Sequence, residues 1–107
     1  MKYGDQVELL MKKTMLMEKE IDSKIILCSI LRYDMKEECI YLVLENDLLQ
    51  NISLDAEYEC KILMKEECSC IGTVKERYYN EYGKILKFQI KNGFYKINVK
   101  SVDKQMA

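Results

Sequence analysis

The sequence lacks histidine, tryptophan and proline, and its 107 residues include only two arginines, Arg32 and Arg77. Without histidine there is no Ser–His or Cys–His dyad and no imidazole ligand for a metal. Because the planar fork of arginine is the usual means of recognising phosphate or guanine, its scarcity argues against a nucleotide-phosphate site. Without proline, the turns must be set by glycine, asparagine and aspartate.

An excess of one charge is also lacking, because 33% of the residues are charged but the formal net charge is only −1. A protein that grips nucleic acid by its phosphates needs positive charge on one face, so nucleic acid is not the expected partner. No apolar run reaches the length of a membrane span, and residues 1–5 show no apolar signal region. With five cysteines, an odd number, the expected location is the cytoplasm, where thiols stay reduced.

The sequence is rich in apolar residues, and in several stretches they alternate with polar ones. Apolar residues make up 49% of the chain, enough for one modest core. We expect a single domain over residues 1–107, with its core at about residues 4–100 and a fraying tail at 101–107.

The clearest alternation runs through residues 56–65, where Tyr58, Cys60 and Ile62 share one face and charged residues the other. Similar patterns, separated by turn residues, predict an all-β fold of six or seven antiparallel strands, a small barrel or a sandwich, in which no residue is an obvious catalyst. The loop at 46–55 offers Leu48, Leu49, Ile52 and Leu54 as plugs for a barrel end. The expected strands are 6–11, 23–34, 39–45, 56–65, 68–79, 84–90 and, after a hairpin turn at Asn92-Gly93, 94–100.

The cysteines are the first candidates for chemistry. Cys68 and Cys70 would share one face of a strand, with Cys60 opposite, so three thiolates would be within reach of a zinc ion. Structural zinc sites, however, usually place cysteine pairs on turns, whereas C-x-C within a strand points both thiols inward. The pattern therefore favours small core residues over a metal site or a thiol enzyme, and we expect no metal and no cofactor.

Tyrosines and basic residues around the turn at 80–83 are a second candidate. Lys75, Arg77 and Tyr79 are expected on one face, with Tyr82 in the turn. Aromatics interleaved with cations can stack bases, so this face is the alternative site for nucleic acid or a small ligand. The same tyrosines can instead pack the end of the barrel with their hydroxyl groups in water.

Taken in order, the chain resembles the domain that precedes PilZ in flagellar brake (YcgR-like) proteins. Residues 4–9 resemble its opening G-D-x-V-x-L strand and residues 21–25 its Y-x-S-x-V segment. Residues 55–60, 71–75 and 86–90 fall where its later strands lie. The resemblance implies a split barrel without catalytic activity that acts through protein contacts, in cyclic di-GMP-related or motility regulation.

The resemblance does not extend to nucleotide binding. Asn51-Ile52-Ser53 resembles the start of the [D/N]-x-S-x-x-G motif with which PilZ domains contact cyclic di-GMP, but Ala56 replaces the glycine. In the arginine pair that such a site also needs, Lys36 stands for the second arginine. Lysine cannot form the planar fork, so cyclic di-GMP binding is not expected.

The last expected strand, 94–100, is the predicted contact with a protein partner or a second copy, since a final strand presents an unpaired edge. Its outward lysines would discourage indiscriminate pairing. The residues proposed for this surface are Tyr95, Lys96, Asn98 and Lys100.

Overall fold

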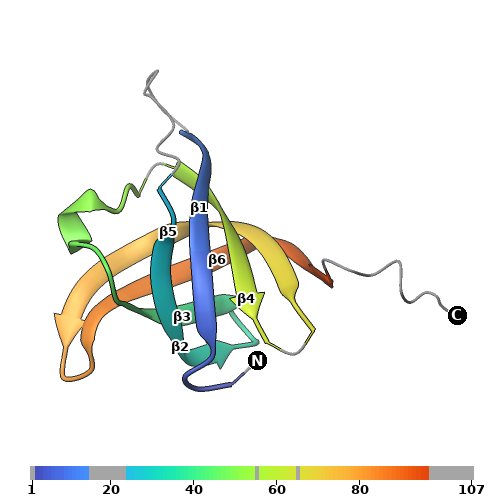
Figure 1. The fold of residues 1–107 in the computed structure, drawn as a ribbon, viewed down its shortest axis with the longest axis horizontal. Coiled ribbons are helices and arrows are strands. Elements are labelled where there is room, and N and C mark those ends of the chain that lie inside the picture. Colours follow the sequence, from blue (N-terminus) through green and yellow to red (C-terminus); the bar gives the residue numbers. More distant parts are fainter. Residues whose placement is uncertain (1, 15–23, 55, 65, 97–107) are drawn as a thin grey trace, which may run out of the picture.

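The computed structural model describes residues 2–14, 24–54, 56–64 and 66–96. Six antiparallel strands form a closed barrel in the order β1-β2-β3-β6-β5-β4, with β4 returning to β1 (Figure 1). The strands are β1 Gln6–Thr14, β2 Ile26–Asp34, β3 Cys39–Leu44, β4 Ala56–Leu63, β5 Cys68–Asn80 and β6 Gly83–Lys96. The prediction of a small all-β antiparallel barrel is confirmed, with six strands rather than seven.

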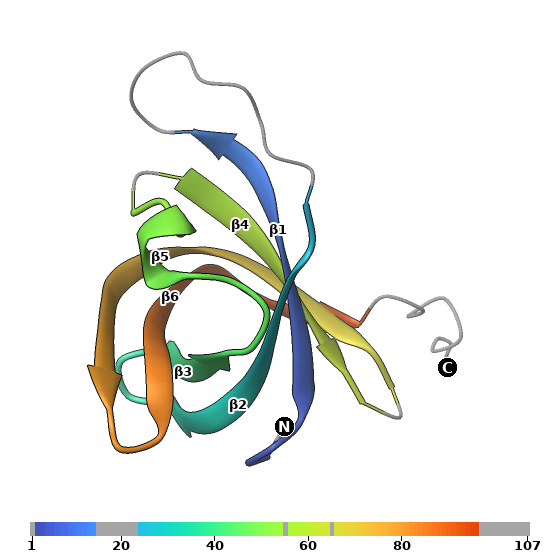
Figure 2. The same ribbon diagram turned by 60° about the vertical axis from the view of Figure 1, so that its left-hand side comes forward.

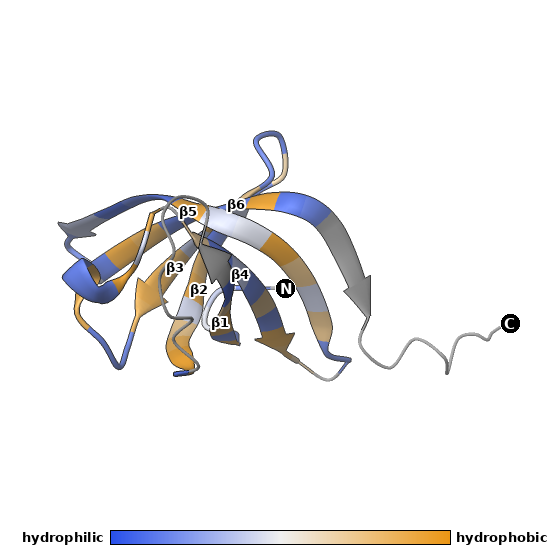
Figure 3. Cartoon of the chain, turned by 90° about the horizontal axis from the view of Figure 1, so that it is seen from above, coloured by the Kyte–Doolittle hydropathy of each residue, from blue (hydrophilic) through white to orange (hydrophobic). Residues whose placement is uncertain are grey.

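Alternation along the strands builds the core, as the banded hydropathy in Figure 3 shows. In β4, Tyr58, Cys60 and Ile62 have no exposed surface, while the residues between them remain partly exposed. Each large side chain removed from water in this way stabilises the fold by roughly 1.5–3 kcal/mol before entropy is counted. The predicted faces of β4 are therefore correct.

The hairpin turn predicted at Asn92-Gly93 is wrong, because β6 continues through it, with a shift of its register against β5 on each side of Asn92. β5 is long enough to pair with β6 as far as Ser69↔Tyr95 and Cys68↔Lys96. That continuing partner keeps the backbone extended where an Asn-Gly pair by itself favours a turn. The start of the predicted strand 94–100 is thus the end of β6, and residues 97–107, with the predicted tail, lie outside the described residues.

The connection from β3 to β4 closes one end of the barrel. In the closed order these two strands lie on opposite sides of the barrel, with two other strands between them in either direction. Their connection therefore crosses the opening. Figure 2 shows this green segment, with a short 3-10 helix η1 at Leu49–Asn51, running across the barrel. Leu49 and Ile52 are buried in the core, as predicted for plugs, whereas Leu48 and Leu54 are exposed.

Two bulges change which side chains face outward. In β2 the register skips one residue between Ile30 and Arg32, and in β5 it skips one between Val74 and Glu76. The extra residues are Leu31 and Lys75. Because the side-chain period of a strand is two, each bulge moves every later residue of its strand to the opposite face.

Candidate functional site

A row of four side chains crosses the outer face of the barrel between the two bulges. Arg32 pairs with Tyr41, Tyr41 with Lys87, and Lys87 with Glu76. The Arg32 guanidinium lies 4.0 Å from the centre of the Tyr41 ring, and the Lys87 ammonium lies 5.9 Å from it. The pKa of Lys87 is raised, most by the Tyr41 hydroxyl group and less by Glu37 and Glu76. Two cations thus lie against one aromatic ring.

Next to this row the outer face is hollowed by a groove of about 580 Å³, which we call the tyrosine groove. The described residues of its lining comprise four tyrosines, one cation, one amide and one leucine, with no carboxylate among them. Tyr3 and Tyr82 stay largely exposed, at 73% and 55% of their surface. The residues that line it are Tyr3, Leu31, Arg32, Tyr41, Tyr78, Asn80 and Tyr82.

An apolar strip lies beside the groove. Ile85 pairs with Val43 on one side and Tyr78 on the other. It lies on the outer face, since its neighbour Leu86 belongs to the core, yet it has no exposed surface. Ile85 is thus covered by its neighbours beside the groove, whose own lining combines aromatic walls with polar side chains.

The turn between β5 and β6 positions Tyr82. The Asn80 side-chain oxygen accepts a hydrogen bond from the Tyr82 backbone N–H at 2.8 Å. Gly83 adopts a φ of 121°, a conformation that glycine reaches without steric cost. With its oxygen used in this way, the Asn80 side chain has its NH₂ group left to offer to a ligand.

The predicted face of Lys75, Arg77 and Tyr79 is divided by the β5 bulge, which separates Lys75 from the other two, while Tyr82 lies in the turn as predicted. Lys75 is the extra, exposed residue of the bulge. Arg77 pairs with the core residue Leu86 and Tyr79 with Lys84, so both point toward the barrel end. Only Tyr82 of this set lines the tyrosine groove.

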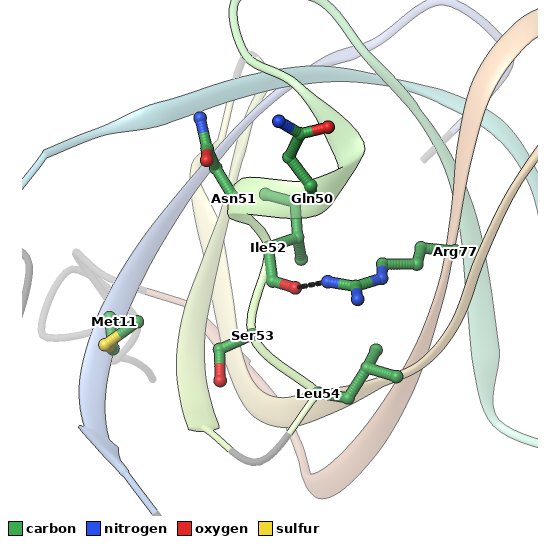
Figure 4. Close-up of a pocket in the computed structure, with 7 residues that line it drawn as sticks. All are labelled: Met11, Gln50, Asn51, Ile52, Ser53, Leu54 and Arg77. Atoms are coloured by element: carbon green, nitrogen blue, oxygen red, sulfur yellow. Dashed lines mark hydrogen bonds between the residues drawn. The ribbon is translucent and has the colours of Figure 1, made fainter. Parts of the chain in front are cut away.

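Arg77 contacts the plug instead. Its guanidinium donates hydrogen bonds to the carbonyl oxygens of Ile52 and, at 3.2 Å, Leu49 (Figure 4). A second hollow of about 460 Å³ surrounds this contact. Figure 4 shows Gln50, Asn51, Ser53 and Leu54 around it, with Met11 on β1 at the side opposite Arg77. The walls of this hollow are thus largely the plug residues and the arginine that holds them.

The stretch resembling a cyclic di-GMP motif lies in this plug. The Asn51 side-chain NH₂ donates to Asp47 at 2.7 Å, and Ile52 is fully buried. The Ser53 backbone N–H donates to the hydroxyl group of Tyr58 at 3.0 Å. All three motif residues are therefore engaged in holding the loop.

For the other four residues predicted at an interface, the structure describes at most the backbone. The backbone of Tyr95 and Lys96 belongs to β6 and pairs with β5, but their side chains lie outside the described part. Asn98 and Lys100 fall entirely outside it.

Three of the five cysteines, Cys28, Cys60 and Cys70, belong to the core, whereas Cys68 is partly exposed. Cys60 and Cys70 face each other across β4 and β5, and neither has exposed surface. The hydrogen bond between their thiols and their burial raise the pKa of Cys60 well above its usual range. Burial likewise raises the pKa of Cys28. Among the described residues, no three His, Cys, Asp or Glu side chains gather as a metal site.

The acidic pairs Glu37-Glu38 and Glu66-Glu67 are exposed in the connections between strands. The Gln89 side chain donates to the backbone oxygens of Glu37 and Glu38 at 2.9 and 3.2 Å, which ties the first connection to β6.

Sequence reasoning found Tyr82 and missed the other six groove residues. They come from the N-terminal turn, β2, β3 and β5, and no single segment shows a pattern that unites them. The only available signal was the number of tyrosines, eight in 107 residues.

No helix in the described ranges is long and apolar enough to cross a membrane. Comparisons of this chain with protein-family models, with curated proteins and with solved structures found no match.

Proposed function

We propose that this barrel is a non-enzymatic binding module that engages a protein partner through the tyrosine groove. The observation behind this proposal is the convergence of four tyrosines, Arg32 and Asn80 on one outer face. Tyrosine supplies a large, rigid contact area and a polar tip, and both tyrosine and arginine are enriched where binding energy concentrates.

The composition of the groove supports binding rather than catalysis. Among the residues that the structure describes, its lining holds no carboxylate, thiol or lysine amine to act as a general acid or base. The proposed location is the cytoplasm, where the five free thiols would stay reduced.

The PilZ-associated role belongs to the same proposal. The motif layout of residues 4–9 and 71–75 supports a module that acts in cyclic di-GMP-related or motility regulation through protein contacts, without binding the nucleotide. The partner would be a different protein or a second copy of this chain.

A second candidate function is nucleic-acid or small-ligand binding. The arrangement that favours it is Arg32 and Lys87 stacked about Tyr41, because bases stack on aromatic rings and guanidinium groups. It requires positive charge for the phosphates, and one cation lines the groove.

Selection of phage-displayed random peptides on the immobilised barrel tests the first proposal. We expect enriched peptides that bind the wild type and lose affinity for Tyr82→Ala. Tyr79→Ala is the matched control, since Tyr79 is exposed on the same hairpin but faces the barrel end. Peptides that bind both variants equally, or no enrichment together with a monomeric protein in sedimentation, would contradict a protein-contact groove.

A further inference from the structure

We infer that the tyrosine groove takes an extended, proline-containing segment of a partner protein, with one carboxylate of that segment paired to Arg32. This inference rests on the proposed function as a protein-contact module and names the chemistry of its partner.

The backbone under the groove excludes strand addition at its centre. Tyr41 of β3 is paired with Arg32 and with Lys87, so β3 has a strand on each side there. Ile85 of β6 is likewise paired with Val43 and with Tyr78. A peptide lying across these strands finds no unpaired N–H or C=O groups, so side chains must hold it.

The chemistry of the walls selects among the remaining modes. A helix docks by aliphatic anchors in an apolar groove, whereas the only aliphatic side chain in this lining is Leu31. A polyproline II segment has no internal hydrogen bonds, so its carbonyl groups need donors from the partner. Tyrosine hydroxyl groups and the NH₂ group of Asn80 are such donors.

Proline also matches the walls sterically. Its ring is flat and apolar, and it packs on the faces of aromatic side chains that line grooves of this kind. Because the segment is already extended before it binds, it loses little conformational freedom, and a shallow groove can hold it.

Arg32 supplies the specificity for charge. Of the described residues that line the groove, it is the only cation and none is a carboxylate, and its side chain is 58% exposed. Stacking on Tyr41 holds the guanidinium in one orientation. Arg32 forms a long ion pair with Asp34, with 4.0 Å between Nη1 and Oδ2, which is beyond hydrogen-bond length, so the N–H groups of the fork can still bind a carboxylate of the segment.

The charge balance favours a peptide over a polynucleotide. A nucleic-acid strand brings one phosphate per nucleotide, and a groove that spans several nucleotides needs several cations. This groove has one. A segment with a single acidic residue matches that number.

The probe is a blocked decaproline peptide with one central glutamate, titrated into the isotopically labelled full chain and followed by NMR and calorimetry. We expect shifts confined to amides around the groove and a Kd in the micromolar to millimolar range. Tyr82→Ala should weaken binding at least about fivefold, as loss of an aromatic anchor does. Tyr79→Ala should leave it unchanged.

A double-mutant cycle between the protein and the peptide tests the pairing of Arg32 with the glutamate. Replacing the glutamate of the peptide by glutamine, or Arg32→Gln in the protein, should each weaken binding about two- to fivefold, and the two changes together no further. A glycine–serine peptide with the same glutamate should bind more weakly than the proline probe. Equal binding of that peptide, additive effects in the cycle, or absence of shifts at millimolar probe would overturn the inference.

Two outcomes separate this inference from the proposed function. If selected peptides lack proline yet depend on Tyr82, the module binds protein and the proline inference fails. If a twelve-nucleotide oligothymidylate binds more tightly than the probe and depends on Tyr82, the groove belongs to nucleic acid and both proposals fail.

Discussion

The guanidinium of Arg77 donates a hydrogen bond to the carbonyl oxygen of Ile52, which precedes it by 25 residues in the chain. This contact joins β5 to the plug that crosses the barrel end, and the Leu49 carbonyl shares the same donor group. Ile52 has no exposed surface, so the plug depends on this contact to satisfy a backbone oxygen.

Arg77→Met should therefore lower the free energy of unfolding by about 1–3 kcal/mol, the cost of leaving the buried Ile52 oxygen unpaired, whereas the Leu49 oxygen keeps its bond from the Ile52 N–H. Urea denaturation monitored by circular dichroism measures it. Lys75→Met is the matched control, since Lys75 is the exposed residue of the bulge, and it should change stability by less than about 0.5 kcal/mol. Equal effects of both substitutions would show that the plug is not held by Arg77.

Gly72 should not tolerate a side chain. A Cβ at this position would lie 2.1 Å from the backbone oxygen of Gln89 and 2.9 Å from the Phe88 ring. Gly72→Ala must push β6 away or displace a core aromatic, so we expect a loss of about 1–3 kcal/mol or more in unfolding free energy. Thr73→Ala, at the neighbouring and partly exposed position, is the control. A Gly72→Ala protein as stable as wild type would contradict the close packing of β5 on β6.

Asp47 should make the free energy of unfolding depend on pH in the acid range. Hydrogen bonds from Asn51, from the Leu48 N–H and from Lys24 lower its pKa from 3.8 to about 2. Because the pKa is depressed in the folded state, the stabilisation is present above pH 4 and is lost as the pH falls from about 4 to 2.

Urea midpoints measured at pH 6, 4, 3 and 2 should show this decline in the wild type. In Asp47→Asn the decline should be smaller, with stability lower at pH 6 because the ionised contacts are gone. Glu81→Gln, in the exposed turn, serves as the control. A variant Asp47→Asn with the same acid dependence as wild type would show that other carboxylates cause it.

The thiols should differ in reactivity. Cys68 is partly exposed, whereas Cys28, Cys60 and Cys70 have no exposed surface, and burial raises the pKa of Cys28 and Cys60. Since the thiolate is the reactive form, native protein should alkylate at Cys68 first and at the buried thiols only on unfolding. Timed alkylation with mass spectrometry measures the order, and Cys68→Ser should abolish the fast phase. Rapid native modification of Cys60 would contradict its place in the core.

Cyclic di-GMP should bind no more tightly than a weak, non-specific ligand. Lys36 stands where an arginine fork is needed, and Asn51 and Ile52 already hold the plug. Calorimetry tests this directly, and a micromolar or tighter Kd would contradict it.

The sequence by itself determined the class of fold and most of the core. Period-two alternation is local, so the faces of β4 can be read from Tyr58, Cys60 and Ile62 without knowing their neighbours. Apolar residues in a polar loop, Leu49 and Ile52, likewise indicated a plug. Such signals suffice because burying one face of a strand requires nothing more specific than a partner surface.

Only the tertiary structure decided which residues meet on the outside. The bulges at Leu31 and Lys75 come from pairing with other strands, and each reverses the faces that alternation predicts beyond it. The same pairing keeps β6 extended through Asn92, where local preference favours a turn. Tyr3, Arg32, Tyr41 and Tyr82 lie in separate segments of the chain, and closure of the barrel brings them together. A site assembled by strand register has no period of its own in the sequence, because register is a property of pairs of strands.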